Sequence, residues 1–81
     1  MFTNKSQDGQ TNICGAQIAR LRKEMNLSQR QLADALQLAG LDVDKNAIQR
    51  IEAGKRFVTD IELVYLAKVL NTDLETLLNY E

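Results

Sequence analysis

The stretch that decides the fold is residues 28–56, SQRQLADALQLAGLDVDKNAIQRIEAGKR, because it contains two helical patterns separated by a turn. Ser28 and Gln31 have the spacing of a capping box, which marks the start of a helix. Gly40 is the expected end of this helix, since glycine readily adopts the left-handed conformation that follows a helix. The buried side of the helix is predicted to comprise Leu32, Leu36 and either Ala33 or Ala35.

A second helix is predicted over residues 45–53, after Asp44, a favourable N-cap residue, and before Gly54. Ile48 and Ile51 are three residues apart, so they share one face of this helix and should dock it onto the core. The polar residues between them point elsewhere. A merely solvated face and a face that reads a ligand both fit this pattern, and the rest of the chain must decide between them.

A helix before this pair is predicted from an apolar stripe at helical spacing, formed by Cys14, Ile18, Leu21 and Met25. Asn26 tolerates the left-handed conformation and is the expected end of that helix.

Two helices are predicted after the pair. The first begins with a capping box of Thr59 and Glu62 and closes at Asn71. Its core side is Ile61, Ala67, Leu70 and either Val64 or Leu63. The last helix starts at Thr72 or Asp73 and is expected to bury Leu74, Leu77 and Leu78. No segment has the alternating pattern of a strand, so the fold class is all-α, with five short helices.

Composition excludes several classes of function. The chain has 81 residues, enough for one small domain. With no histidine and a single cysteine, it lacks the ligands of a usual zinc site and the base of histidine-dependent nucleophilic catalysis. It contains no glycine-rich phosphate loop and no evident acid/base pair of carboxylates, so we expect neither an enzyme nor a cofactor. The lone cysteine and the absence of a long apolar run or signal peptide predict a soluble, cytoplasmic protein without membrane contact.

Charge is unevenly distributed along the chain, although the net charge is only −1. Residues 20–56 contain eight lysines and arginines against five acidic residues, whereas residues 57–81 contain one lysine against five acidic residues. The middle of the chain could therefore face a polyanion, while its C-terminal part could not.

The paired helices, with a polar N-terminal half on the second, have the layout of a helix-turn-helix DNA reader. The segments ICGAQIARLRKEMNLSQRQLADAL (13–36), NAIQRIEAGKR (46–56) and LAKVLNTDLETLL (66–78) resemble the lambda repressor/Cro-type helix-turn-helix family of transcriptional regulators. The resemblance covers residues 13–78 and implies a five-helix, lambda-repressor-like DNA-binding domain. Residues 1–12 are polar and have no periodic apolar pattern, so we expect a disordered leader there and a helix-turn-helix domain over residues 13–81.

The resemblance also implies roles for individual residues. It makes residues 28–38 the scaffold helix and residues 45–53 the recognition helix. The positions expected to reach base edges are Lys45, Asn46 and Arg50. Those expected to contact the phosphate backbone are Gln29, Gln49, Lys55 and Arg56. Arg22 and Glu52 match positions that pair across the first and third helices, so a partly buried ion pair is expected there. Asparagine can bond bidentately to adenine, and arginine or lysine to guanine, which suits the first group.

The segment LQLAGLDVDKN (36–46) departs from the family pattern, because it is about five residues longer than usual. We expect a scaffold helix that is one turn longer and reaches Leu38 or Ala39, followed by a loop in which Leu41 and Val43 pack inward. The longer segment could change the tilt of the recognition helix, or it could form a surface for a partner protein.

The function predicted from the sequence is a sequence-specific regulator of transcription, expected to be a repressor, that binds double-stranded DNA. The resemblance implies a homodimer on a palindromic operator, with Leu78 and Tyr80 as candidates for the dimer surface. These apolar residues could equally close the monomer core. The alternative is a protein-interaction module, such as an antitoxin-like or partner-docking domain, that has kept the fold.

Overall fold

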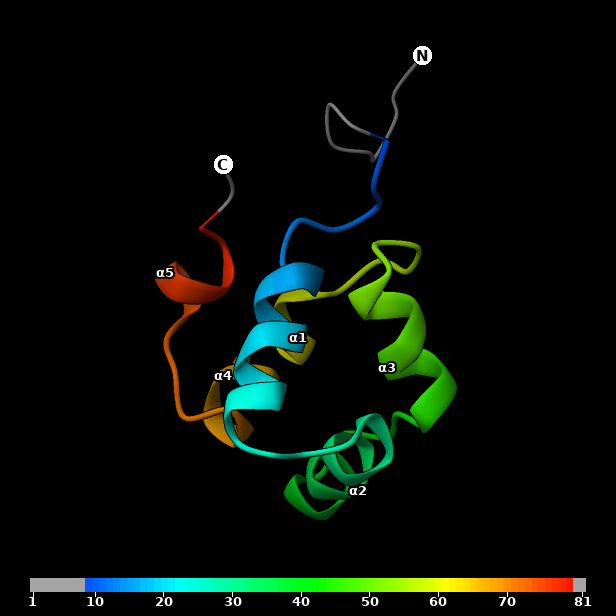
Figure 1. Ribbon diagram of the computed structural model, residues 1–81, viewed down its shortest axis with the longest axis vertical. Coiled ribbons are helices and arrows are strands. Elements are labelled where there is room, and N and C mark those ends of the chain that lie inside the picture. Colours follow the sequence, from blue (N-terminus) through cyan, green and yellow to red (C-terminus); the bar gives the residue numbers. More distant parts are fainter. Residues whose placement is uncertain (1–8, 80–81) are drawn as a thin grey trace.

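The computed structural model describes residues 9–79, and within that range the chain forms five helices (Figure 1). They are α1 (Gly15–Glu24), α2 (Gln29–Ala39), α3 (Lys45–Glu52), α4 (Asp60–Val69) and α5 (Leu74–Leu77). The described residues contain no strand, so the all-α fold class is confirmed. None of these helices is long and apolar enough to cross a membrane.

The helix starts follow the predicted caps. Ser28 accepts a hydrogen bond from the backbone N–H of Gln31, whose side chain accepts one in return from the N–H of Ser28. Thr59 and Glu62 form the same reciprocal pair at the start of α4. The Asp44 carboxylate accepts from the N–H of Ala47 at the start of α3. These bonds satisfy backbone donors that have no partner inside the helix.

The helix ends are also those predicted. Gly40 follows α2 with a φ of 111°, in the left-handed region that glycine adopts without a steric penalty. Asn26 and Asn71 take φ values of 58° and 55° after α1 and α4. Asparagine is one of the few residues that tolerates this conformation, so the polar residues at these two turns are placed by backbone geometry.

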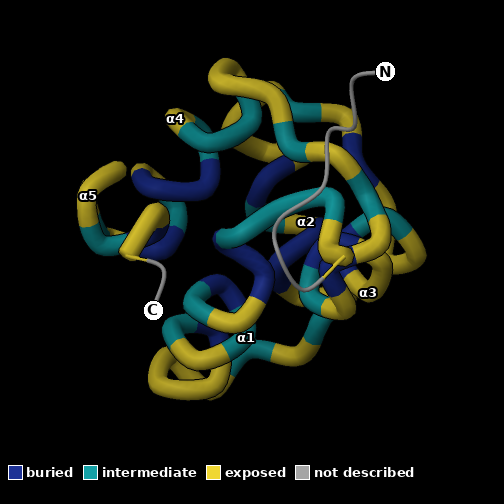
Figure 2. Tube along the Cα trace, turned by 90° about the horizontal axis from the view of Figure 1, so that it is seen from above, coloured by how far each residue is buried: buried dark blue, intermediate teal, exposed yellow. Residues whose placement is uncertain are grey.

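The core lies between the helices and is aliphatic (Figure 2). Its fully buried members come from all five helical segments and include Ile18, Leu32, Leu36, Ile48, Ile51, Leu66 and Leu77. Helix α3 packs on α1 and α2, whereas α5 packs on α4 and α1. Figures 1 and 2 both show α3 and α5 on opposite sides of the molecule, so these two helices present separate surfaces.

The expected lengthening of α2 is confirmed, because the helix runs to Ala39. Val43 is buried and Leu41 packs against the core, as predicted for the loop that follows. The side-chain amide of Gln37 donates to the carbonyl oxygen of Val43 at 2.7 Å and ties this loop to the helix. Leu38, by contrast, is 91% exposed.

Several residues predicted as core are exposed. Ile61 is 65% exposed and Val64 is 43% exposed, whereas Leu63 packs on the core. Helix α4 is apolar on more than one face, so its pattern did not specify which face is buried. In α5, only Leu77 is buried, because a helix of four residues has room for one inward-facing side chain. The prediction that Leu74, Leu78, Ile61 and Met25 belong to the core is wrong.

The expected disordered leader extended to residue 12, but two of its residues are hydrogen-bonded to the domain. The backbone N–H of Thr11 donates to the carbonyl oxygen of Gly54, and the Asn12 side chain contacts the end of α3. Residues 1–8 lie outside the described part of the chain, as do residues 80–81. Hydrogen bonds to the domain are thus already present at Thr11 and Asn12, before residue 13. The domain boundary expected at residue 13 stays a prediction.

Candidate nucleic-acid interface

The exposed face of α3 gathers the residues predicted to reach DNA. Ile48 is fully buried and Ile51 is 2% exposed, so these two side chains hold one face of the helix against the core. Lys45, Asn46, Gln49 and Arg50 are all exposed on the other side. Because α3 is anchored on one side only, its polar side chains all face solvent on the other side and offer several hydrogen-bonding groups there.

A shallow hollow of about 310 Å³ lies along this face. Its lining brings together residues of α3 and of the loop that follows, namely Asn46, Gln49, Arg50, Ala53 and Lys55. Four of these five residues were singled out from the sequence. Ala53 adds a small apolar surface between them, and sequence reasoning did not assign it a role.

The C-terminal end of α3 is fixed by an ion pair between Arg22 of α1 and Glu52, the last residue of α3. The Arg22 Nε donates to Glu52 Oε2 at 2.6 Å, and Nη2 donates to Oε1 at 3.0 Å. The two side chains are only 10% and 8% exposed. The hydrogen bonds with Glu52 outweigh the cost of burial and raise the pKa of the Arg22 guanidinium above its usual value. The structure thus brings together the two residues expected to pair.

Two further contacts extend this pair into a network. Arg22 Nη1 donates to the backbone carbonyl of Leu27, in the turn between α1 and α2. The Nε2 of Gln29 donates to Glu52 Oε1 at 3.0 Å. Gln29 was expected to contact phosphate, and in this structure its amide joins the first residue of α2 to the last residue of α3. The network therefore ties α1, α2 and the end of α3 together and fixes the angle between α2 and α3.

The two cations after α3 differ in their surroundings. Lys55 is exposed and lines the hollow beside α3. Arg56 forms a bidentate ion pair with Glu62 at 3.0–3.1 Å, and its side chain is only 29% exposed. Arg56 is therefore engaged by a carboxylate of α4. Sequence reasoning missed this pair because Glu62 was interpreted only as the second member of a capping box.

Glu62 accepts from both Arg56 and the backbone N–H of Thr59. Burial alone would raise the pKa of this carboxyl group, but the hydrogen bonds from Arg56 and Thr59 outweigh burial. The pKa of Glu62 consequently lies below its usual value. The carboxylate stays charged near neutral pH and holds the loop that carries Lys55 and Arg56 against α4.

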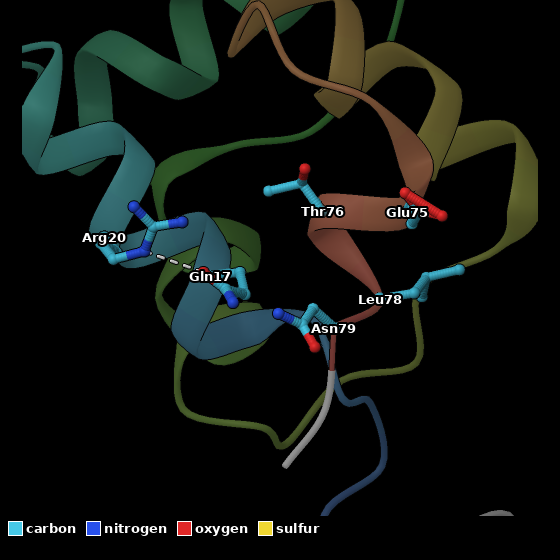
Figure 3. A pocket seen from close by; sticks show the side chains of 6 residues that line it. All are labelled: Gln17, Arg20, Glu75, Thr76, Leu78 and Asn79. Atoms are coloured by element: carbon cyan, nitrogen blue, oxygen red, sulfur yellow. Dashed lines mark hydrogen bonds between the residues drawn. The ribbon is translucent and has the colours of Figure 1, made fainter.

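A different hollow, of about 620 Å³, lies on the other side of the domain between α1 and α5 (Figure 3). Gln17 and Arg20 line it from α1, where the Arg20 Nε donates to Gln17 Oε1 at 2.9 Å. Glu75, Thr76, Leu78 and Asn79 line it from the C-terminal segment. It is wide and open to solvent, and Figure 3 shows its polar groups spread around the rim rather than converging on one point.

Within residues 9–79, no group of three histidine, cysteine, aspartate or glutamate side chains lies close enough together to hold a metal ion. Within the same range, every buried side-chain nitrogen or oxygen has a hydrogen-bond partner. The exposed face of α3 is accordingly the surface whose chemistry best matches a ligand.

Comparison with known proteins agrees with this geometry. The sequence model of a helix-turn-helix family matches residues 18–77, which include α2, α3 and the turn between them. The chain belongs to the lambda repressor/Cro-type helix-turn-helix family. Within it, α2 and α3 form the helix-turn-helix of this regulator. The family consists of DNA-binding regulators rather than enzymes.

Among solved structures, this helix-turn-helix protein is similar to the restriction-modification controller protein C.AhdI from Aeromonas hydrophila. The two are 26% identical, with a TM-score of 0.69, and the match covers 79% of this chain and 86% of that one. No curated protein sequence matches at a significant level. The family and the similar structure together identify the chain as a DNA-binding transcriptional regulator.

Proposed function

We propose that this protein is a sequence-specific repressor of transcription that reads the major groove of double-stranded DNA with α3. The observation that carries the proposal is the one-sided anchoring of this helix. Ile48 and Ile51 are buried, and every polar side chain between Lys45 and Arg50 is exposed on the other face. A helix presented in this way fits the major groove, which is about 12 Å wide.

Base recognition is assigned to Lys45, Asn46 and Arg50. The guanidinium of Arg50 and the ammonium of Lys45 match the two acceptors of a guanine edge, and the amide of Asn46 matches the donor and acceptor of adenine. Support comes from the exposure of all three side chains and from the hollow that Asn46 and Arg50 share.

Phosphate contacts are assigned to Gln29, Gln49, Lys55 and Arg56. Exposed Lys55 is the strongest of these candidates, since no carboxylate is paired with it in the described residues. Arg56 and Gln29 each have a protein partner, so binding DNA with them would require sharing a donor or exchanging a partner. We therefore expect Lys55 to contribute more to phosphate binding than Arg56.

The proposed assembly is a homodimer on a palindromic operator, with half-sites about 34 Å apart. Leu74 and Leu78 are 41% and 43% exposed, so among residues 9–79 nothing covers this apolar surface on and beside α5 fully. Because α5 and α3 lie on opposite sides of the domain, pairing through α5 would hold two recognition helices apart (Figure 1). Tyr80, the other candidate for this surface, lies outside the described residues.

A protein-interaction module is the second candidate function. The observation that favours it is Leu38, which stands 91% exposed at the end of the lengthened α2. The two functions differ in their salt dependence. Affinity for DNA should fall steeply as salt rises, because lysine and arginine displace counterions from phosphate, whereas an apolar contact should change little.

The experiment that tests the proposed function is the selection of random duplex DNA on the purified protein at about physiological salt. A Lys45→Ala/Arg50→Ala variant is the control, since both side chains are exposed and their loss should leave the fold intact. We expect an enriched palindromic motif that the control does not enrich. A folded wild-type protein that enriches no motif would refute sequence-specific binding and favour the interaction module.

A further inference from the structure

The side chain of Asn12 joins the segment before α1 to the C-terminal end of α3 and the turn after it. Asn12 precedes α1, yet its side chain reaches the far end of α3. Its Nδ2 donates to the carbonyl oxygen of Ile51 at 3.1 Å and to that of Arg56 at 2.7 Å. Its Oδ1 accepts from the backbone N–H of Gly15 at 2.9 Å. Two segments about 40 residues apart in the sequence thus meet at one side chain.

The chemistry of this contact fixes the orientation of the amide. An asparagine side chain has two donor hydrogens on nitrogen and an acceptor oxygen, and all of them are used here. Two carbonyl oxygens face Nδ2 and one N–H faces Oδ1, so the reversed orientation would oppose like groups. Carbonyl groups in the last turn of a helix lack intrahelical partners, and that of Ile51 accepts from both Asn12 Nδ2 and the backbone N–H of Gly54.

Two neighbours of Asn12, Gly15 and Thr11, also pack closely against the end of α3 and the turn after it. Gly15 lies so close that a Cβ atom there would overlap the carbonyl oxygen of Ile51. The backbone N–H and the hydroxyl of Thr11 both donate to the carbonyl oxygen of Gly54, at 2.8 and 3.0 Å. The turn that carries Lys55 is therefore held on both sides, at Gly54 and at Arg56.

We infer that Asn12 is a positioning residue for DNA recognition, which sets the C-terminal end of α3 and the turn containing Lys55 relative to the rest of the domain. The inference rests on the proposed function. Arg22 holds the last residue of α3 through the carboxylate of Glu52. Asn12, from the segment before α1, holds the backbone at the same end of the helix. Base-reading side chains on α3 then keep one orientation in the groove, which is a condition for discrimination between base pairs.

Two substitutions test this role. Asn12→Ala removes the hydrogen bonds of this side chain, whereas Asn12→Asp is nearly isosteric and keeps the acceptor for Gly15 but cannot donate to Ile51 or Arg56. The control is Val69→Ala, a partly buried position on α4, which packs on α2 and α5. Its loss of thermal stability can be compared directly with that of the Asn12 variants.

The first readout is the ratio of affinity for the selected operator to affinity for a scrambled duplex of the same composition. Measurements are made at a temperature where circular dichroism shows all variants folded. We expect this ratio to fall about tenfold in both Asn12 variants, because the hydrogen bonds that hold the end of α3 and the turn after it are lost. It should stay at the wild-type value in Val69→Ala. A wild-type ratio in either Asn12 variant, or an equal fall in Val69→Ala, would overturn the inference.

The second readout needs no DNA and separates the inference from the proposed function. The N–H groups of Gly54 and Lys55 donate to Ile51 and Arg50 at the end of α3. We expect hydrogen exchange at these two amides to accelerate about tenfold in Asn12→Ala and to be unchanged in Val69→Ala. If the wild-type protein selects no operator, the proposed function fails, and this exchange pattern alone decides whether Asn12 positions α3. Unchanged exchange at these two amides in Asn12→Ala would refute the positioning role of Asn12.

Discussion

Replacement of Glu52 by glutamine should destabilise the domain far more than the loss of an ordinary surface charge. Glu52→Gln preserves the size of the side chain but leaves the Arg22 guanidinium without its counter-ion. Since the two side chains are 10% and 8% exposed, water cannot compensate the charge well. Removing one partner of a buried pair costs about 3 kcal/mol or more. For a domain of this size, such a loss lowers the melting temperature by roughly 12–24 °C.

The chain offers a matched control for this prediction. Arg20 and Glu24 form an ion pair within α1 at 2.8 Å, but their side chains are 49% and 59% exposed. Glu24→Gln should therefore cost no more than about 0.5 kcal/mol, because water screens an exposed pair. Both variants are compared with the wild type by urea unfolding, followed by far-UV circular dichroism.

A further variant separates the cost of an unpaired buried charge from the cost of changing the two side chains. In Arg22→Met/Glu52→Gln, no unpaired charge remains, so the double variant should be less destabilised than the sum of the two single variants. If Glu52→Gln costs no more than Glu24→Gln, the pair does not act as a buried anchor of α3, and the reasoning about its orientation is refuted.

Three other predictions concern α3 and its surroundings. Lys55→Ala should weaken binding to operator and scrambled DNA alike and reduce the slope of log affinity against log salt by about 1, measured by fluorescence anisotropy; a sequence-dependent loss would contradict a phosphate role. Gly15→Ala should lower the free energy of unfolding by about 1–3 kcal/mol in chemical denaturation, because its Cβ would overlap the carbonyl oxygen of Ile51; an unchanged midpoint would show that α1 and α3 can separate without cost. The lowered pKa of Glu62 means that its ion pair with Arg56 stabilises the fold above the unfolded-state pKa of about 4.3, and that this contribution is lost as pH falls through the lower native pKa. Glu62→Gln should therefore be less stable than wild type at neutral pH and converge with it in acid, in urea titrations across this range; a stability difference that does not shrink would contradict the assignment.

Local features of the fold could be predicted because short-range rules determine them. Ser28, Asp44 and Thr59 cap helices through bonds to residues three positions away, and Asn26 ends a helix by its own backbone conformation. The buried face of α3 followed from two isoleucines among polar neighbours, so the exposed candidate face followed as well.

Other features depend on contacts that sequence spacing does not reveal. Helix α4 is apolar on several faces, and only packing on α2 and α5 determines that Leu63 rather than Ile61 turns inward. Asn12 contacts residues about 40 positions away, so no local pattern announced it. One local signal was available: Asn12 lies three residues before Gly15, the first residue of α1, and accepts a hydrogen bond from its backbone N–H. The ion pair of Arg56 with Glu62 likewise depends on the packing of the loop after α3 beside α4, which sequence spacing does not specify.

The central claim is that the exposed face of α3 reads bases, and a double-mutant cycle between Arg50 and DNA tests it most directly. Affinities are measured for wild type and Arg50→Ala on the selected operator and on operators with each base pair changed singly. We predict that Arg50→Ala costs about 1–3 kcal/mol on the operator and abolishes discrimination at one base pair, while the other positions keep theirs. Discrimination that is unchanged at every base pair in Arg50→Ala would contradict the claim that this face of α3 reads the sequence.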